Sequence, residues 1–560
     1  MEMNKLDIAS AVAAFIDNAI SADEIASLIE TPADTKNGDL SFPCFKLAKV
    51  LRKSPAVIAS DIASKISLPD YIEKVDAVSG YLNFYIKPSY YAGLLANITD
   101  DSAIRTSGKG KTVCLDFSSP NIAKRFHLGH IGTTIIGNAL RNIFAYCGWN
   151  VVAINHLGDW GTSFGKLLCA YKMWSSREKV EQDGVSELER IYARFNKEAQ
   201  ENDSLNQDAR DAFCALENGN EEYREIWSYF REISLREYMK TYKVLGIDFD
   251  SYTGESFFTD KMPAVVQELK DKNMLVLDDG ASVVDLSEYN MPPCLILKRD
   301  GSTLYPTRDI AAAKWRKQEY DFDKCLYVTS AGQSLHFAQW FKVVELMGYD
   351  WSKGLVHVPY GTMSFGGEKL ASRTGNIIYL DDLLAQAIEK AEKIIEEKNA
   401  DLKNKHETAV AVGVGAIVFN ALFNARIKDV DFSWDTALTF EGSTGPYLQY
   451  TYARACSVLR KCGDAGSYDG YTPNGDEINL IKQLSLFSEK VALSLEQYEP
   501  SVITRYLLET SGLFNQFYHS SPVVKAEGAE KNFRITLTSA FRVIAGECLE
   551  LLGMRKTEEI

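Results

Sequence analysis

One stretch decides the fold of this chain: Thr112-Val113-Cys114-Leu115-Asp116-Phe117, then a loop that ends in His127-Leu128-Gly129-His130. The first segment is an apolar run bounded by polar residues, which is typical of a buried strand. A helix is expected from about residue 128 to 146, and Val151-Val152-Ala153-Ile154 reads as a second strand. A strand, a helix and a strand in this order predict a βαβ unit whose two strands lie parallel in one sheet.

The regions on either side of this βαβ unit have different hydrophobic patterns. Residues 1–30 and 43–66 have apolar residues at helical spacing, and 81–86 reads as a strand, which indicates a small α+β domain. Residues 102–111 are polar and contain two glycines, so they are a candidate linker. Further strands are expected at 281–286, 294–298, 324–328 and 355–360, a polar helical insertion at about 170–245, and mainly helix from 381. The expected domains are 1–105, 106–430 and 431–560.

Length and charge limit the possible functions. A chain of 560 residues, 46% of them hydrophobic, is too long for one core and should form several domains. Its 61 basic and 76 acidic residues give a formal net charge of −15. This is a mild argument against a nucleic-acid partner, because such proteins often carry a basic excess. A basic groove on a protein that is acidic overall would still bind a nucleic acid.

The ten cysteines are scattered singly, and no Cys-x-x-Cys pair occurs. We therefore expect no structural zinc site and reduced thiols in a cytoplasmic protein. The N-terminus lacks the basic start and apolar core of a signal peptide. Because no apolar run approaches the roughly 20 residues needed to cross a bilayer, we expect no membrane association.

The segment His127-Leu128-Gly129-His130 follows a strand and begins a helix, where free backbone N–H groups attract phosphate. Gly129 lets a flat base approach the backbone, and the two histidines lie on one side of the first turn. Imidazoles placed there can donate hydrogen bonds to phosphate oxygens as charge develops. The alternative is that two histidines flank a glycine by chance, since so short a motif is weak evidence by itself.

Several further segments indicate which protein family the motif resembles. Together with Ser119-Pro120-Asn121, it resembles the "HIGH" signature of class I aminoacyl-tRNA synthetases, in the form used by arginyl-tRNA synthetases. Other segments that resemble this family follow in the same order along the chain: 38–49, 80–84, 155–161, 305–313, 333–337 and 442–450. The resemblance implies a Rossmann-like α/β catalytic domain, an N-terminal α+β domain that contacts tRNA, and a C-terminal all-α anticodon-binding domain.

The resemblance also implies how arginine is held. A guanidinium is planar and permanently charged, so a site that reads it needs a carboxylate. Asp309 should take that role, with Tyr305 one helical turn before it and Gln333 completing the pocket. The α-amino and carboxylate end is expected at Ser119, Asn121, His130 and Asn155. The alternative for Asp309 is a surface ion pair with its neighbour Arg308, which would be the ordinary situation for a charged residue.

ATP is expected at a second set of residues: His127, Gly129, His130, Lys369, Ser372 and Arg373. The last three match the mobile Lys-Met-Ser-Lys-Ser loop of class I synthetases, and they depart from it. Ala371 replaces the first serine, and the second lysine is replaced by Arg373 or is absent. Another cation should therefore assist, and Lys124, three residues before His127, is the candidate. The catalytic set is then His127, His130, Lys124 and Lys369.

The implied reaction activates L-arginine with ATP and transfers it to the 3′-terminal ribose of tRNA(Arg). No carboxylate cluster suggests a dedicated metal cage, so Mg²⁺ should arrive with the nucleotide. In the C-terminal region Tyr447, Tyr450 and Arg454 lie close together, which suits unpaired RNA bases. Packing is the alternative for each tyrosine. We expect a monomer.

Three rival hypotheses remain. The first is a class I synthetase for another amino acid, such as cysteine. Specificity for cysteine is disfavoured because paired zinc-ligand cysteines are absent. A His-x-Gly-His nucleotidylyltransferase would leave the flanking domains unexplained. A non-catalytic RNA-binding relative is disfavoured by the intact His127, Gly129 and His130.

Overall fold

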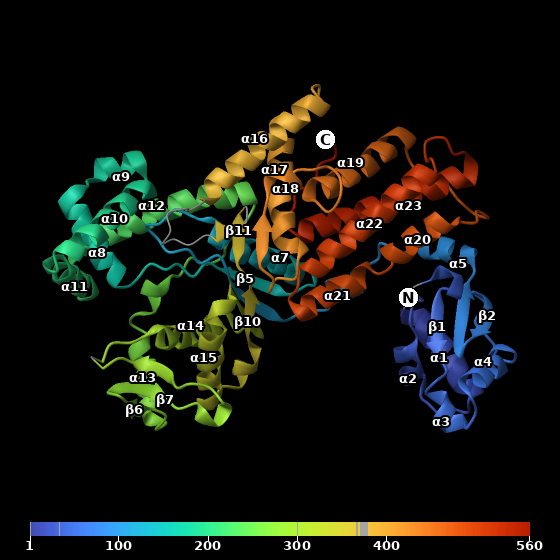
Figure 1. Ribbon diagram of the computed structural model, residues 1–560, viewed down its shortest axis with the longest axis horizontal. Helices are drawn as coiled ribbons and strands as arrows, with labels where there is room; N and C mark the ends of the chain where they lie inside the picture. The colour runs from blue at the N-terminus through green and yellow to red at the C-terminus, as the bar shows by residue number, and fades with distance from the viewer. Residues whose placement is uncertain (1, 33, 300, 366–367, 370–378) are drawn as a thin grey trace. The chain divides into compact units, whose positions relative to one another are not determined.

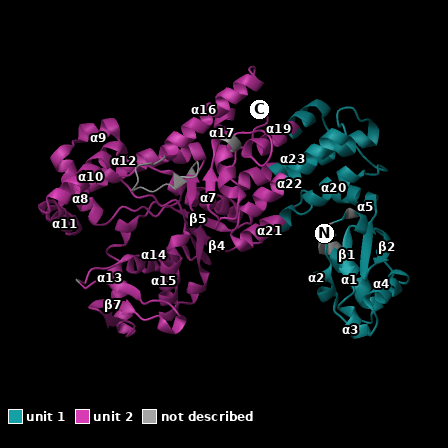
Figure 2. Cartoon of the chain, in the orientation of Figure 1, with its two compact units in different colours: residues 1–100, 455–489, 509–545 teal, residues 101–454, 490–508, 546–560 magenta. Residues whose placement is uncertain are grey.

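The computed structural model describes residues 2–32, 34–299, 301–365, 368–369 and 379–560 (Figure 1). The chain forms two compact units (Figure 2). Unit 1 comprises residues 1–100, 455–489 and 509–545, and unit 2 comprises 101–454, 490–508 and 546–560. Four helices each contribute residues to both units: α19 (Gly445–Cys462), α21 (Phe487–Gln497), α22 (Ser501–Ser520) and α23 (Gly528–Leu551).

Unit 1 contains a three-stranded antiparallel sheet in the order β1-β3-β2, with bounds Leu40–Pro43, Tyr81–Ile86 and Ile72–Val78. Leu40, Phe42, Leu82 and Phe84 are fully buried, and they alternate with the polar Ser41 and Asn83, which are buried as well and form a hydrogen bond of 2.7 Å with each other. The helices of this region are α1 (Glu2–Phe15), α2 (Ala22–Leu28), α3 (Leu47–Leu51), α4 (Pro55–Ala63) and α5 (Pro88–Leu95). The α+β expectation for the first hundred residues is therefore confirmed.

Unit 2 is built on a four-stranded parallel sheet in the order β10-β9-β4-β5. Its strands are β4 (Thr112–Asp116), β5 (Asn150–Ile154), β9 (Lys324–Ser330) and β10 (Leu355–Tyr360). The helix between the first two is α7 (Ile131–Tyr146), entered through the short 3₁₀ turn η2 (Leu128–His130). The predicted βαβ unit is therefore present. In this order, β5 lies on one side of β4 and β9 lies on the other, so the strand order reverses at β4. Such a switch point is where ligands bind in open α/β folds.

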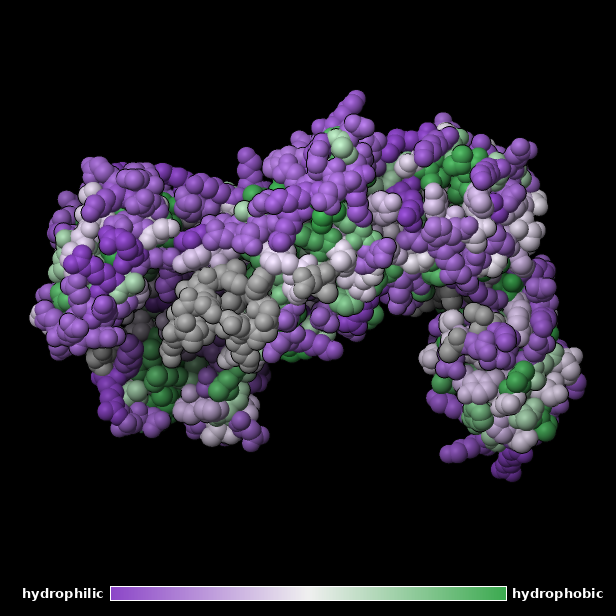
Figure 3. Space-filling view, turned by 45° about the horizontal axis from the view of Figure 1, so that its top comes forward, coloured by the Kyte–Doolittle hydropathy of each residue, from purple (hydrophilic) through white to green (hydrophobic). Residues whose placement is uncertain are grey.

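Five consecutive helices after β5 form the insertion: α8 (Thr162–Trp174), α9 (Arg177–Asp183), α10 (Val185–Glu201), α11 (Ser204–Glu217) and α12 (Glu221–Leu245). Their outer face is mostly hydrophilic, at the left of Figure 3. Their inner faces share one apolar core with Ile122, Ala123 and Leu157, which belong to the loops after β4 and β5. Packing of the insertion therefore holds the loops that carry the motif.

The expected strands at 281–286 and 294–298 lie outside the parallel sheet. They are β7 (Ala281–Val284) and β8 (Cys294–Leu297), which pair antiparallel with β6 (Val276–Asp278). Helices α13 (Met262–Asp271), α14 (Tyr305–Tyr320) and α15 (Ser334–Leu346) pack with these strands and with β4 and β9 around one core. The remaining short turns are 3₁₀ helices: η1 (Thr35–Asn37), η3 (Glu255–Phe258), η4 (Ser287–Tyr289), η5 (Ala331–Gln333) and η6 (Asp350–Gly354).

The expected linker at 102–111 begins with a helix, α6 (Ser102–Arg105), and belongs to unit 2. From residue 380 the described chain is mainly helical, as expected. The elements from residue 380 are α16 (Leu380–Lys398), α17 (Lys405–Phe423), β13 (Val430–Phe432), α18 (Trp434–Ala437), α19 (Gly445–Cys462), α20 (Gly475–Leu484), α21 (Phe487–Gln497), α22 (Ser501–Ser520) and α23 (Gly528–Leu551). Strand β13 belongs to a small sheet in the order β12-β11-β13, whose other strands, β11 (Met363–Phe365) and β12 (Glu368–Lys369), precede residue 380.

Helix α17 corrects one expectation drawn from the sequence. It is 19 residues long and apolar enough to meet the length and composition of a membrane span, although no such run was expected. Within the structure, 72% of its most apolar window is buried inside the protein. An all-round apolar helix of this kind is also what a central core helix requires.

Candidate functional site

The loop after β4 is held in an unusual backbone conformation. Ser118 and Ser119 have φ angles of 69° and 46°, which non-glycine residues seldom adopt. The Ser119 hydroxyl donates to Asp116 Oδ1 at 2.8 Å and accepts the backbone N–H of His156 at 3.2 Å. These bonds join the carboxyl ends of β4 and β5, so the predicted Ser119 lies at the ligand-binding edge of the sheet.

The two histidines of the motif lie against each other at the start of α7. Their ring centroids are 3.9 Å apart, as the three-residue spacing predicts. Nδ1 of His127 accepts the backbone N–H of Gly129 at 3.1 Å, so the neutral ring carries its proton on Nε2. A Cβ on Gly129 would lie 2.8 Å from this imidazole, so the close approach requires glycine.

Both imidazoles are neutral at physiological pH. Burial, with the nearby His127 and Lys124, lowers the pKa of His130 to about 3. Burial and then the charge of Lys124 also lower the pKa of His127. Neutral rings present N–H donors without a fixed positive charge. Lys124 itself is exposed, and no described carboxylate lies within ion-pair distance of it.

Two tyrosines of the insertion support the loop from behind. The Tyr238 hydroxyl lies 2.7 Å from the carbonyl oxygen of Asn121 and 2.6 Å from that of Lys124. One turn later, the Tyr242 hydroxyl lies 2.7 Å from Ser118 Oγ and accepts Asn155 Nδ2 at 2.9 Å. Sequence reasoning missed both tyrosines. Their four-residue spacing places them on one face of α12, but nothing in that spacing indicates what the face contacts.

The two predicted asparagines differ in position. Asn121 is exposed, and its side chain lies over Gly158, where a Cβ would come within 2.0 Å of the amide oxygen. Asn155 is fully buried behind Tyr242, and among the described residues its Oδ1 has no hydrogen-bond partner. Asn121 is therefore accessible from solvent, whereas Asn155 lies beneath the loop.

Helix α14 places Tyr305 and Asp309 one turn apart. Asp309 Oδ2 lies 2.6 Å from Nε2 of His336 on α15, while Arg308 pairs with Glu255 at 2.9 Å. The alternative in which Asp309 pairs with Arg308 is therefore wrong. Asp309 retains 26% exposure, so the carboxylate is reachable by a ligand. Tyr305 is 64% exposed, and Gln333, at the end of η5 after β9, is exposed as well.

Glu255 is a further carboxylate beside Arg308, and no sequence pattern distinguished it. Burial raises its pKa to about 7, opposed by Arg308 and assisted by Asp309 and Asp159. Its charge state therefore changes near neutral pH, next to the residue expected to bind a guanidinium.

The structure describes only part of the second segment expected to bind ATP. Lys369 lies in β12, opposite Ser364 of β11. Ser372 and Arg373 lie outside the described residues. Within the described part of the chain, no group of three histidine, cysteine, aspartate or glutamate side chains could hold a metal ion, and the ten cysteines are free.

The expected RNA-contacting residues lie on the part of α19 that belongs to unit 2. The Arg454 guanidinium lies 5.0 Å from the ring centroid of Tyr450, which is 38% exposed. Tyr447 is half-buried. The neighbouring Tyr452 is buried, so packing explains that residue.

Comparisons with family models cover almost the whole chain. Residues 94–434 match the catalytic domain of class I tRNA synthetases (R), and 448–560 match the DALR anticodon-binding domain. Residues 6–86 match the arginyl tRNA synthetase N-terminal domain.

Curated proteins and solved structures agree with these matches. The chain is 45% identical over 544 residues to the arginine–tRNA ligase of Alkaliphilus metalliredigens, covering 96% of each chain. It is 46% identical over 548 residues to that of Clostridioides difficile, covering 97% of each. Arginyl-tRNA synthetase from Thermus thermophilus superimposes with a TM-score of 0.83 at 25% identity, covering 99% of both chains. The Plasmodium falciparum enzyme has the same fold, with a TM-score of 0.80.

Proposed function

The chain belongs to the arginyl-tRNA synthetase family and joins arginine to tRNA(Arg) in an ATP-dependent reaction, and on this premise we propose how its residues divide the work. In the first step a carboxylate oxygen of arginine attacks the α-phosphorus of ATP. Arginyl-adenylate forms and pyrophosphate leaves. In the second step a hydroxyl of the 3′-terminal ribose attacks the arginyl carbonyl, and AMP leaves.

The observation that carries the assignment of roles is the histidine pair at the start of α7. His127 keeps its Nε2–H free of the Gly129 bond, and His130 packs on the same side of the turn. Both would donate to phosphate oxygens as charge moves toward pyrophosphate. Lys124 and Lys369 would supply positive charge, and Gly129 would let the nucleotide approach. Ser372 and Arg373 remain proposed ATP contacts on the sequence alone.

The arginine pocket is proposed at the other side of the same sheet edge. Asp309 would hold the guanidinium, with Tyr305 and Gln333 lining the pocket. Ser119, Asn121 and His130 would hold the α-amino and carboxylate end. Asn155 would act from beneath the loop through Tyr242. No side chain needs to be a nucleophile, because positioning and charge stabilisation suffice for this chemistry.

Mg²⁺ fits this site only as a companion of the nucleotide. The groups at the start of α7 are N–H donors, which repel a cation, and no carboxylate cluster was found among the described residues. Phosphate oxygens would therefore hold the ion, and it would neutralise charge on the leaving pyrophosphate. We further propose a cytoplasmic monomer without membrane association, domains at 1–105, 106–430 and 431–560, and contact of Tyr447, Tyr450 and Arg454 with tRNA.

The test of this function is charging of total tRNA with each standard amino acid in turn. Arginine alone is expected to give acid-stable product, and only on tRNA(Arg). Charging with another amino acid, or none with arginine, would overturn the proposal. The variant Asp309→Asn in the same assay separates loss of arginine recognition from general inactivity, because its KM for ATP should be unchanged.

A further inference from the structure

The motif loop, residues 118–127, is joined to the start of α16 through Arg125, which directly follows Lys124. Nη2 of Arg125 donates to both carboxylate oxygens of Asp381, at 3.0 and 2.9 Å, and to Asp382 Oδ2 at 3.2 Å. The guanidinium also lies over the ring of Tyr379, 3.6 Å from its centroid. One exposed ion pair holds a loop weakly, whereas a network of several contacts holds it in one geometry.

Backbone groups and a glutamate strengthen the same junction. The N–H of Leu380 donates to the carbonyl oxygen of Phe126 at 2.8 Å. The N–H of Arg125 donates to Glu189 Oε1 at 2.6 Å, and Glu189 Oε2 accepts the hydroxyl of Tyr379 at 3.3 Å. Helix α10 of the insertion, the motif loop and the start of α16 therefore meet at Arg125.

The two residues proposed to act on the phosphates flank Arg125 in this loop. His127 forms an isolated antiparallel bridge with Tyr379, the residue whose ring lies under the guanidinium. The side chain of Lys124 is exposed, and no described carboxylate lies within ion-pair distance of it. The place of its charge is therefore set by the backbone that carries it.

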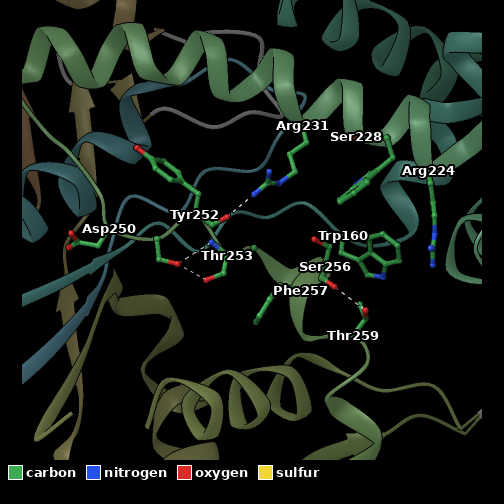
Figure 4. Close-up of a pocket in the computed structure, with 13 residues that line it drawn as sticks. Trp160, Arg224, Ser228, Arg231, Asp250, Tyr252, Thr253, Ser256, Phe257 and Thr259 are labelled. Atoms are coloured by element: carbon green, nitrogen blue, oxygen red, sulfur yellow. Dashed lines mark hydrogen bonds between the residues drawn. The ribbon is translucent and has the colours of Figure 1, made fainter. Parts of the chain in front are cut away.

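Helix α12 supports the same loop. The hydroxyl of Tyr238 lies 2.6 Å from the carbonyl oxygen of Lys124. The helix itself is anchored by Arg231, whose Nη2 donates to the carbonyl oxygen of Tyr252 at 2.8 Å, and both residues line a cavity of about 820 Å³ (Figure 4). The loop is therefore supported by α12 through Tyr238 and by α16 through Arg125.

We infer that Arg125 is a positioning residue for adenylate formation. Its contacts with α16 fix the backbone that carries Lys124 and His127, so that the cation and the imidazole meet the charge of the leaving pyrophosphate in one geometry. Donors stabilise a transition state when they are held in place beforehand, and a displacement of about 1 Å can lower a rate about 100-fold. The inference rests on the proposed function, which assigns the phosphates to Lys124 and His127.

The test measures arginine-dependent ATP–pyrophosphate exchange with tRNA(Arg) present. Arg125→Ala should lower kcat about tenfold and leave the KM for arginine and for ATP within about twofold, because the donors are displaced while ground-state contacts remain. Arg125→Lys should recover part of the rate, since it keeps the charge but loses the planar contact with the ring. Asp381→Asn should lower kcat about threefold, and the double variant should be no slower than Arg125→Ala, because both changes break one contact.

The matched control is Arg105→Ala. The guanidinium of Arg105 also lies over a tyrosine ring, 4.1 Å from the centroid of Tyr146. It also pairs with two carboxylates, those of Asp101 and Glu547, at 2.7 and 3.1 Å. None of these contacts involves the motif loop, so Arg105→Ala removes the same kinds of interaction and should leave the exchange rate unchanged.

Four outcomes would each overturn the inference. They are a wild-type rate in Arg125→Ala, an equal loss of rate in Arg105→Ala, an additive loss in the double variant with Asp381→Asn, and a raised KM for ATP at unchanged kcat, which would make Arg125 a direct contact of the nucleotide. Lys124→Ala in the same assay separates the two levels of the argument. A slow Lys124→Ala with a fast Arg125→Ala would refute the inference alone, whereas a wild-type rate in Lys124→Ala would refute the proposed role of Lys124.

Discussion

The guanidinium of Arg316 lies 2.7 Å from Oδ2 of Asp116, and Arg316 is only 1% exposed. The other oxygen of Asp116 accepts the Ser119 hydroxyl. An ion pair buried beneath the sheet edge therefore fixes the serine expected to hold arginine. Nearby charge outweighs burial here, and the pKa of Arg316 is raised well above its usual value.

Replacing Arg316 with methionine should leave Asp116 as an uncompensated buried charge. Breaking a buried pair on one side costs about 3–5 kcal/mol. Hydrogen exchange of the β4 amides should accelerate correspondingly. The matched change Lys317→Met, at a partly exposed neighbour on the same helix, should cost less than about 1 kcal/mol. Equal effects of the two substitutions would contradict a special role for the buried pair.

The C-terminal tail stabilises the end of α12. Arg555 Nη2 donates to the carbonyl oxygens of Val244 at 2.8 Å and Lys243 at 3.2 Å, both in the last turn of the helix, where carbonyl groups run short of partners. Arg555→Ala should destabilise the end of α12 by about 1 kcal/mol, since a cation there also favours the helix dipole. Hydrogen exchange of residues 238–246 measures this. Lys556→Ala, which removes only an exposed pair with Glu550, should leave that exchange unchanged.

Glu255 predicts a pH dependence of arginine binding. Its pKa is about 7, so it is protonated at pH 6 and ionised at pH 8, where it adds negative charge beside Asp309. The groups that act on it are Arg308, Asp309 and Asp159. The KM for arginine should therefore fall as pH rises from 6 to 8, by at most about tenfold. Glu255→Gln should flatten this profile. An unchanged slope in that variant would assign the titration to another group.

Several elements could be predicted because their signals are local. The apolar run at 112–117, the helix at 128–146 and the strand at 151–154 depend on periodicity, and the histidine spacing predicted that both rings lie on one side of the first turn. By contrast, Glu255, His336 and Tyr242 reach the site from separate parts of the chain. Their roles depend on long-range packing, which no local pattern encodes, and the resemblance to a family supplied Asp309 but not its partner.

The pair Asp309–His336 predicts a graded loss of arginine recognition. Asp309→Asn removes the charge that a guanidinium requires, and a charged hydrogen bond contributes about 1.5–3 kcal/mol, so KM for arginine should rise about 10- to 100-fold. His336→Gln should raise it less, by about fivefold, because the carboxylate loses only the 2.6 Å bond that orients it. The control is Glu319→Gln. Glu319 is an exposed acid on the same helix, so this change should leave the KM for arginine unchanged.

Lys124 gives the sharpest test of how the site compensates for its altered second loop. Lys124→Ala should lower the rate of arginine-dependent ATP–pyrophosphate exchange about 10- to 100-fold, because a cation near the leaving phosphates is lost, while the affinity for arginine changes little. Lys124→Arg should recover part of the rate, since it keeps the charge, and Lys109→Ala should retain the wild-type rate because Lys109 is exposed and lies before β4. The pKa of His127 gives an independent reading: the charge of Lys124 lowers it, so the alanine variant should show it higher by NMR. Normal exchange in Lys124→Ala together with a raised His127 pKa would show that Lys124 is close to the imidazole without taking part in the reaction, and the missing cation would then have to come from elsewhere in the chain.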